Sequence, residues 1–400
     1  MKILVACTLP EDALQELRSL ASETIYRPDL TAEQMPELVG DVSVLIVGRT
    51  RVSPEVIAAG RSLEMIVRVG TNTSNIAVDE ASAQGVFVCN CPHKDAIAVA
   101  ELALGLLLAL DRRLPEHIAA QQRGGRTELP AGDALGLAGR TLGVVGFGPV
   151  GQAIARRAQG FDMSVLAWSP TLTPELAAAH RVGFCAWPRE LARQSDMVAV
   201  HAPQQEVDDF LVDAEFLRNM REGAYLVYIG HPAALDESAL VEIAPRRKLR
   251  FAYDTHAPHV ADSDAGRFRS RLRELPDVIG THHLADRTRQ AREATAVEAV
   301  RVVREFLVSG QALNCVNLLA RSPATWQLAL RLRDTVGVMA AVMDHIRADG
   351  INAQEITSRV FAGARAAACV IALDERPSSE ALSAIRNLDG VLHLELRALV

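Results

Sequence analysis

Three glycines with the spacing GxGxxG lie between the apolar run LGVV and the helix-like segment VGQAIARRA. In this pattern the first glycine permits a tight turn, the second lets a pyrophosphate approach the backbone, and the third allows close packing of helix on strand. Free N–H groups at the start of the helix would meet the phosphate oxygens. A glycine-rich turn without a ligand is the alternative. The predicted dinucleotide site comprises Gly146, Gly148, Pro149, Val150 and Gly151.

One position beyond this turn bears on the choice of dinucleotide. An acidic residue usually ends the next strand, about 20 residues on, and binds the ribose hydroxyls. Ser169 occupies that place, within Trp168-Ser169-Pro170. Losing the carboxylate removes repulsion against a 2′-phosphate, yet no arginine follows at once to attract one. The expected cofactor is therefore NAD or NADP, with the preference open.

The segments that must position this turn alternate between apolar runs and helix-like stretches. Such βαβα alternation predicts parallel sheets covered on both faces. The last 75 or so residues follow a different order, βαββαβ, which is typical of a ferredoxin-like module. The fold class is therefore α/β. The predicted strands of the parallel sheets include 42–48, 63–70, 86–90, 196–203, 224–230, 249–254 and 276–283.

Composition limits the classes of partner. The chain has 400 residues, enough for two or three domains, and a formal net charge of -7, which disfavours nonspecific binding to nucleic acid or to anionic membranes. No apolar run reaches the ~18 residues of a membrane span. The six cysteines are scattered and form no CxxC pair. We expect a cytoplasmic protein with reduced thiols and no nucleic-acid or membrane partner.

The glycine turn, the segment RAQGFDMSVLAWSP and the blocks downstream resemble the D-isomer-specific 2-hydroxyacid dehydrogenases. VGRTRVSPEVIAAG, VGTNTSN and the C-terminal tail are similar to the D-3-phosphoglycerate dehydrogenases in layout, and the tail resembles an ACT regulatory domain. The resemblance implies a cytoplasmic oxidoreductase that interconverts a 2-oxo acid and a 2-hydroxy acid, here in serine biosynthesis. It implies a split flavodoxin-like substrate domain (1–97 plus 287–320), an inserted Rossmann domain (98–286) and an ACT-like domain (324–400).

The catalytic blocks depart from the family pattern. The family uses a histidine as acid/base, an arginine to hold the substrate carboxylate and a glutamate to tune the histidine. His283 matches the histidine, while His231 stands at the arginine position and His259 at the glutamate position.

These two exchanges alter the chemistry. Arginine grips a carboxylate with two parallel N–H bonds, whereas histidine offers one and is largely neutral at pH 7. A second imidazole cannot raise the pKa of His283 as a carboxylate would. We therefore expect either a slow or altered dehydrogenase, or a catalytically silent relative that binds nucleotide or an effector.

The resemblance also carries over residues around the cofactor and the substrate. His201, Pro203 and Asp254 match positions near the nicotinamide. The glycine pair that faces the substrate carboxylate is replaced by His93 and Lys94, and Lys94 is either a substitute cation or a solvated loop lysine. The remaining substrate positions are Arg49 and Thr50, which match a phosphate-contacting pair, and Asn75.

In the tail, the resemblance implies a small-effector site, commonly for an amino acid, at Asp334, Gly337 and Asn352. A module that only dimerises is the alternative, and a homodimer or homotetramer is expected. Histidines are concentrated in the catalytic blocks, but no cysteine and no HxxxH helix joins them, so no metal is predicted. These histidines are His231, His256, His259, His282 and His283.

Overall fold

The computed structural model describes residues 1–125, 134–202, 210–254, 271–275, 278–282, 284–319 and 321–399. The chain divides into two compact units, Met1–Asn317 and Leu318–Val400. Among the residues described, no helix is long and apolar enough to cross a membrane.

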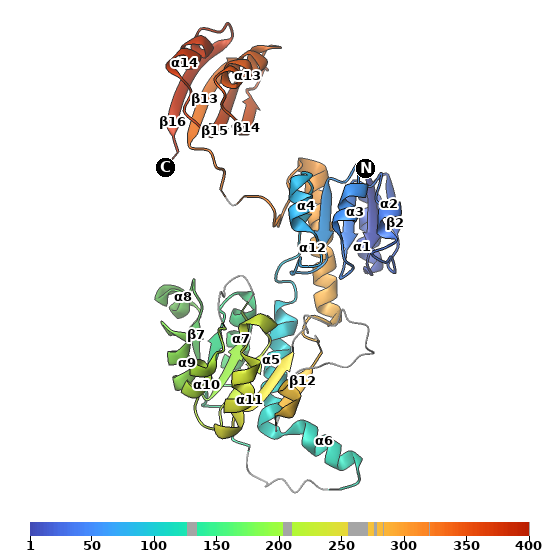
Figure 1. The fold of residues 1–400 in the computed structure, drawn as a ribbon, viewed down its shortest axis with the longest axis vertical. Coiled ribbons are helices and arrows are strands. Elements are labelled where there is room, and N and C mark those ends of the chain that lie inside the picture. Colours follow the sequence, from blue (N-terminus) through green and yellow to red (C-terminus); the bar gives the residue numbers. More distant parts are fainter. Residues whose placement is uncertain are drawn as a thin grey trace. The chain divides into compact units, whose positions relative to one another are not determined.

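The first unit opens with a five-stranded parallel sheet in the order β2-β1-β3-β4-β5 (Figure 1). This is the flavodoxin-like order, with its switch point beside β1. All strands except β2 are nearly continuous apolar runs, as expected for a sheet that is covered on both faces. The strands are β1 (Lys2–Ala6), β2 (Glu23–Tyr26), β3 (Val44–Val47), β4 (Met65–Arg68) and β5 (Phe87–Cys89), and the helices between them are α1 (Glu11–Leu20), α2 (Met35–Leu38), α3 (Pro54–Ala59) and α4 (Val78–Ala83).

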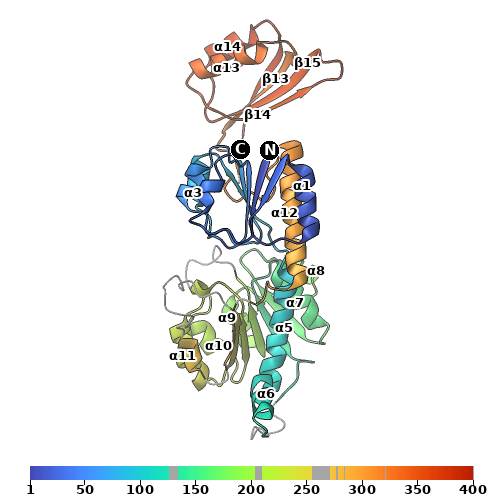
Figure 2. The ribbon, with the colours of Figure 1, turned by 90° about the vertical axis from the view of Figure 1, so that its right-hand side faces the viewer.

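A helix from far along the chain completes this lobe. Helix α12 (Arg289–Ser309) packs against α1 and β4 (Figure 2). Its apolar side chains, among them Val300 and Val303, belong to the same core cluster as Ile3 and Val5. The lobe is therefore assembled from both flanks of the segment that forms the second sheet.

The second sheet of this unit has seven parallel strands in the order β12-β11-β10-β9-β6-β7-β8, with a switch point between β6 and β9. This is the Rossmann order with one further strand. Helices α5 and α7 share one core cluster, and α9, α10 and α11 share another. The strands are β6 (Thr141–Val145), β7 (Ser164–Trp168), β8 (Gly183–Phe184), β9 (Met197–Val200), β10 (Tyr225–Tyr228), β11 (Arg250–Asp254) and β12 (Val278–Thr281), and the helices are α5 (Ala96–Arg112), α6 (Leu114–Gln122), α7 (Pro149–Gln159), α8 (Pro174–Ala179), α9 (Pro188–Gln194), α10 (Ala214–Asn219) and α11 (Glu237–Arg246).

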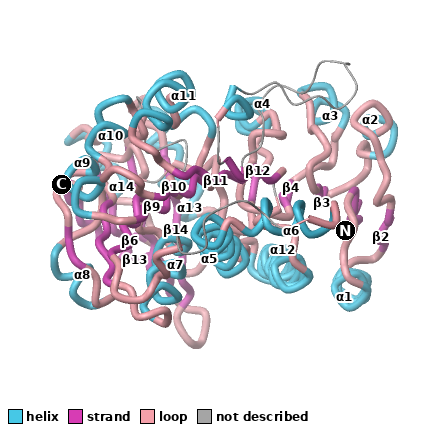
Figure 3. Tube along the Cα trace, turned by 90° about the horizontal axis from the view of Figure 1, so that it is seen from below, coloured by secondary structure: helices cyan, strands magenta, loops and turns pink. Residues whose placement is uncertain are grey.

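The long helices α5 and α12 contact each other; they follow one another end to end in Figure 2, and Figure 3 looks along both of them from below. Helix α5 is apolar on most of its surface because it packs against α7, β10 and β11.

The second unit is a four-stranded antiparallel sheet in the order β14-β15-β13-β16, with the chain order βαββαβ. The alternating burial of β15 places Cys369 and Ile371 in the core with side chains of both helices. The elements are β13 (Trp326–Arg333), α13 (Val338–Ala348), β14 (Ala353–Val360), β15 (Ala366–Leu373), α14 (Ser379–Arg386) and β16 (Val391–Ala398).

These observations confirm the predicted fold class, a flavodoxin-like sheet, a Rossmann sheet and a ferredoxin-like C-terminal module. Strand β2 was not predicted, because its short sequence ETIY has little apolar character. The three-domain boundaries stay a prediction.

Candidate functional site

In the glycine turn at residues 146–151, Gly146 and Gly151 have no room for a side chain, whereas Gly148 has space around its Cα. Gly146 follows β6 with a φ of +91°, and a Cβ there would lie 2.0 Å from the carbonyl oxygen of His201. A Cβ on Gly151 would lie 2.0 Å from the carbonyl oxygen of Gly146, whereas a Cβ on Gly148 would meet none of the described residues within 4 Å. Gly148 is the N-cap of α7, which begins at Pro149. This arrangement fits a pyrophosphate, which would occupy the space that a side chain at Gly148 would fill.

The ribose end of this site lies at the end of β7. Ser169 directly follows that strand and is half-buried. The indole Nε1 of the preceding Trp168 donates a hydrogen bond to the carbonyl oxygen of Ala186 at 3.2 Å, which fixes the ring. Ser169 thus stands where a carboxylate would bind the ribose hydroxyls.

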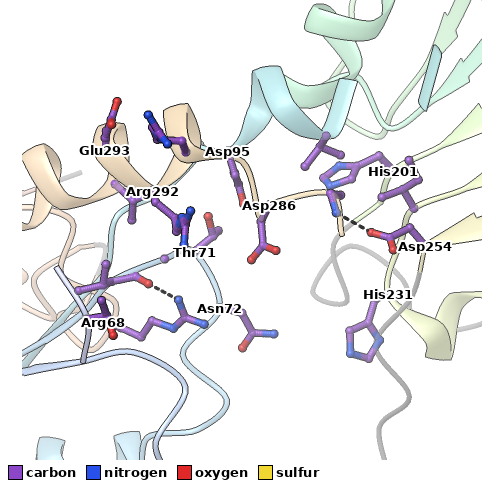
Figure 4. Close-up of a pocket in the computed structure, with 18 of the residues that line it drawn as sticks. Arg68, Thr71, Asn72, Asp95, His201, His231, Asp254, Asp286, Arg292 and Glu293 are labelled. Carbon is purple, nitrogen blue, oxygen red and sulfur yellow. Dashed lines mark hydrogen bonds between the residues drawn. The ribbon is translucent and has the colours of Figure 1, made fainter. Parts of the chain in front are cut away.

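A cavity of about 640 Å³ lies where the carboxyl ends of strands from both parallel sheets meet (Figure 4). Residues 8–10 and 68–72 follow β1 and β4 of the first sheet. His201, residues 229–232 and Asp254 follow or end β9, β10 and β11 of the second. Ligands bind in this crevice in doubly wound α/β folds. The remaining lining residues come from the start of α5, from the segment before α12 and from the first two turns of α12: Asp95, Val99, Ala285, Asp286, Arg289, Arg292, Glu293 and Thr295.

Asp254 is a buried carboxylate whose two oxygens are both occupied. Its Oδ1 accepts hydrogen bonds from the Thr281 hydroxyl at 2.7 Å and the Leu284 amide at 2.9 Å, and its Oδ2 accepts one from the Ala285 amide at 2.9 Å. The side chain is 4% exposed. Asp254 therefore positions the segment that follows β12, along one wall of the cavity.

His201 lines the cavity as a neutral side chain. Burial, with a smaller contribution from nearby His93, lowers its pKa to about 4. Its amide donates to the carbonyl oxygen of Val145, which anchors the end of β9 beside the glycine turn. His201 thus joins the predicted cofactor turn to the cavity, and its assignment to the nicotinamide side stays a prediction.

His231 offers one N–H group in place of an arginine fork. Its Nδ1 accepts a hydrogen bond from the Ala233 amide at 3.3 Å, so the neutral ring carries its proton on Nε2. Burial lowers the pKa of the ring. The hydroxyl of Tyr228 donates to the carbonyl oxygen of His231 at 2.5 Å and so fixes the backbone that follows β10. The cavity therefore has a single uncharged donor at this position.

Arg49, Thr50 and Asn75 form a connected group that does not itself line the cavity. The amide nitrogen of Asn75 donates to the carbonyl oxygens of Gly48 at 3.2 Å and Thr50 at 2.7 Å, and so fixes the loop after β3. Nη2 of Arg49 donates to both carboxylate oxygens of Asp286, at 2.9 and 3.3 Å. Arg49 is thus already paired with an anion that belongs to the chain.

His93 and Lys94 differ in what holds them. His93 has a φ of +63°, in the left-handed region that favours glycine, and its amide donates to the Thr71 hydroxyl. Lys94 forms an ion pair of 3.1 Å with the buried Glu298. Arg301, Asn314 and Lys94 together lower the pKa of Glu298 to about 2.

Six charged cavity residues were missed by the sequence analysis: Arg68, Asp95, Asp286, Arg289, Arg292 and Glu293. Arg68 ends the otherwise apolar strand β4, and its Nη1 donates to the carbonyl oxygen of Val69, while its Nε is buried with no acceptor among the residues described. Burial raises the pKa of Asp95. The lone charge at the end of LEMIVR was the available signal for Arg68.

Four predicted or discussed positions, Pro203, His256, His259 and His283, lie outside the described residues. Within the described part of the chain, no group of three or more His, Cys, Asp or Glu side chains is arranged to hold a metal.

The three predicted effector residues are not brought together within one chain. Asp334 follows the end of β13 and Gly337 caps α13, whereas Asn352 precedes β14. The register pairs Arg333 with Ala366 but Ala353 with Leu373, at the opposite end of β15. An eight-residue strand, roughly 26 Å long, separates the two ends.

The fold and the site define an α/β protein with a dinucleotide turn beside a cavity shared by two parallel sheets. Residues 104–285 match the family model for the D-isomer specific 2-hydroxyacid dehydrogenase, NAD binding domain. Residues 104–285 thus form a domain of this NAD-binding family, and the cofactor is NAD or NADP.

Individual relatives agree with this assignment. A D-3-phosphoglycerate dehydrogenase from Methanocaldococcus jannaschii is 31% identical over 319 residues, which are 80% of this chain and 60% of the relative. The chain thus spans about 60% of that relative's length. A hydroxypyruvate reductase from Thermotoga maritima is 29% identical over 297 residues, 73% of this chain and 94% of the relative.

A solved structure is also similar. The NADPH-dependent glyoxylate/hydroxypyruvate reductase from Sinorhizobium meliloti, in complex with citrate, has a TM-score of 0.66 and 26% identity, and the match covers 80% of this chain and 99% of that one.

Proposed function

We propose that the protein is an NAD(P)-dependent oxidoreductase that interconverts a small 2-oxo acid and its D-2-hydroxy acid, with the layout of phosphoglycerate dehydrogenases and slow or altered turnover. The observation that carries this proposal is the cavity: it opens at the carboxyl ends of strands from both sheets, next to a glycine turn that fits a pyrophosphate. A bound nicotinamide supplies the hydride, and the chain must hold the acid and deliver a proton.

Arg68 is the cation proposed to receive the substrate carboxylate. It lines the cavity at the end of β4, whereas the other lining arginines, Arg289 and Arg292, belong to α12. A guanidinium binds a carboxylate with a pair of N–H bonds and a fixed charge. His231 would add one hydrogen bond from Nε2 and no charge. We retain His283 as the proposed proton donor on the family resemblance alone.

The exchanges at 231 and 259 are the reason to expect slow turnover. A lost bidentate clamp and an untuned acid/base are each worth several kcal/mol of transition-state stabilisation, or a factor of ~10² or more. The test is NADH and NADPH oxidation against a panel of 2-oxo acids that includes 3-phosphohydroxypyruvate. The wild type is compared with a His231→Arg, His259→Glu double variant.

We expect wild-type turnover well below ~1 per second and at least a tenfold gain in the variant. Wild-type turnover at ordinary dehydrogenase rates, ~1–10³ per second, would disprove the proposal of impaired chemistry. The link to serine biosynthesis requires a phosphorylated acid, and for this reason 3-phosphohydroxypyruvate is in the panel.

A catalytically silent, nucleotide-binding role is the second candidate. It is favoured because two predicted substrate cations are already paired within the chain: Arg49, of the phosphate-contacting pair, with Asp286, and Lys94, the possible substitute cation, with Glu298. Energy transfer from Trp168 to NADH would report binding. Binding without turnover of any acid in the panel, by the wild type and by the double variant, would favour this role.

For the C-terminal unit we propose an ACT-like module that binds a small effector, with an amino acid as the first class to test. Asp334 and Gly337 lie at one end of the sheet and Asn352 at the other, so one site could use all three only across two copies. A homodimer or homotetramer would meet this requirement. Sedimentation with and without each amino acid is the test, and a monomer at all concentrations would exclude the shared site.

A further inference from the structure

The ion pair between Arg49 and Asp286 joins loops 237 residues apart in the chain. Arg49 follows β3, and Asp286 lies between β12 and α12. Asp286 lines the cavity, whereas Arg49 does not line it and is bonded to the Asp286 carboxylate. In Figure 4 the Asp286 carboxylate points into the cavity.

A guanidinium binds carboxylates and phosphates with the same pair of parallel N–H bonds. Nη2 of Arg49 already donates to both oxygens of Asp286. A phosphate that reached this wall would have to displace a carboxylate tethered to the chain, which is present at high effective concentration. The displaced carboxylate would then lie beside the phosphate dianion, and like charges at this separation repel strongly.

A second carboxylate lies close by. Asp95 lines the same cavity, and the charge of Asp286 contributes to raising its pKa. The charged lining also includes Glu293 and three arginines, Arg68, Arg289 and Arg292. A dianion placed next to the carboxylates of Asp95 and Asp286 is repelled more strongly than a single carboxylate held at Arg68.

We propose that Asp286 is a specificity-determining residue: it fills the anion-binding position of Arg49, so that the cavity accepts an unphosphorylated acid and rejects its phosphorylated counterpart. This inference rests on the proposed function for its ligand class. The occupation of Arg49 by the Asp286 carboxylate, called the block on Arg49 below, can be tested whether or not the protein turns over an acid.

The test compares D-glycerate with D-3-phosphoglycerate, which differ only by the phosphate, and adds inorganic phosphate as a probe that needs no dehydrogenase chemistry. Dissociation constants are measured by calorimetry on the NADH-loaded protein. The variants are Asp286→Asn, Asp286→Gly, the double variant Asp286→Asn, Arg49→Gln, and Glu293→Gln as a matched control that removes another cavity carboxylate.

We expect the wild type to bind D-glycerate more tightly than D-3-phosphoglycerate. Asp286→Asn and Asp286→Gly should bind the phosphorylated acid and inorganic phosphate about tenfold more tightly, with D-glycerate within twofold. The double variant should lose this gain, and Glu293→Gln should not show it.

Equal or tighter wild-type binding of D-3-phosphoglycerate would overturn the inference, as would no gain in either Asp286 variant with unchanged melting temperature. A gain for inorganic phosphate in a protein that turns over no acid would support the block on Arg49 and count against the proposed function. Turnover of unphosphorylated acids without any such gain would do the reverse.

Discussion

The glycine turn and the neighbouring cavity wall that carries His231 and Asp286 are built in different ways. At the turn, the backbone makes the site: Gly146 and Gly151 have no room for a side chain, and Gly148 leaves space for a ligand. At the wall, side chains make it: His231 presents one neutral N–H, and Asp286 covers Arg49. The turn has the residues that its chemistry needs, whereas the wall has different charges at the positions that would act on the substrate.

This difference separates two kinds of constraint. The pyrophosphate-binding turn depends on glycines, so adding a side chain there would cause a steric clash and a large loss of cofactor affinity. The cavity wall depends on ion pairs between loops that are distant in the chain. Removing one such pair is expected to change ligand affinity or a pKa by a smaller amount. The predictions below follow that order.

The largest effect is expected for Gly146→Ala. Its Cβ would lie 2.0 Å from the carbonyl oxygen of His201, and the φ of +91° is strained for alanine. We expect NADH affinity to fall about 10²-fold or more and the melting temperature to drop. Fluorescence titration with NADH and thermal unfolding measure the two effects.

Gly148→Ala is the matched control, because none of the described residues lies within 4 Å of its Cβ. Its melting temperature should equal that of the wild type while NADH binding weakens, since only the ligand meets the new methyl group. If Gly148→Ala bound NADH as the wild type does, the turn would not hold the pyrophosphate.

The difference between local backbone patterns and long-range charge pairs also explains which features could be predicted from the sequence. The glycine spacing, the buried strands and the βαββαβ tail depend on local patterns, and these predictions are confirmed. The partners of Arg49 and Lys94 could not be predicted, because Asp286 and Glu298 lie more than 200 residues away in the chain. Arg68 and Asp95 were missed because their meaning comes from the cavity that folding creates around them.

The next effect concerns Asp254, the buried acceptor of three hydrogen bonds. Asp254→Ala leaves the Thr281 hydroxyl and two amides without an acceptor, which should cost about 2–4 kcal/mol of unfolding free energy. Denaturant unfolding is the measurement, and Thr281→Val, which removes only one donor, should cost less. An unchanged stability combined with lost NADH binding would make Asp254 a cofactor ligand instead of a positioning residue.

A smaller effect is expected from His201 as the pH falls. Its pKa is about 4 in the folded protein because of burial, against an ordinary value of 6.5. The unfolded chain therefore binds the proton first, and the stability that neutral His201 provides is full above pH 6.5 and is lost as pH falls through about 4.

This loss should reach roughly 1–2 kcal/mol by pH 5, seen as a falling melting temperature. His201→Asn should flatten the curve between pH 4 and 6.5 but leave acid unfolding below pH 4, where Glu298, with a pKa of about 2, is still to be protonated. A variant curve parallel to that of the wild type over pH 4–6.5 would mean that His201 is not the group that titrates.

The smallest effect is expected at Ser169, at the end of β7. Like the cavity wall, this position has a different polar side chain from the one that usually contacts the ligand. Here the backbone cradle is kept but the ribose-binding carboxylate is absent. Ser169→Asp should restore two hydrogen bonds to the ribose of NADH and repel the 2′-phosphate of NADPH, so the NADH-to-NADPH affinity ratio should rise about tenfold, or about 1.4 kcal/mol. Titration of both cofactors measures the ratio, and Ser164→Asp, on the exposed start of the same strand, controls for added charge. A ratio that does not move would place the ribose elsewhere and would confine the family-like part of the site to the six residues of the glycine turn.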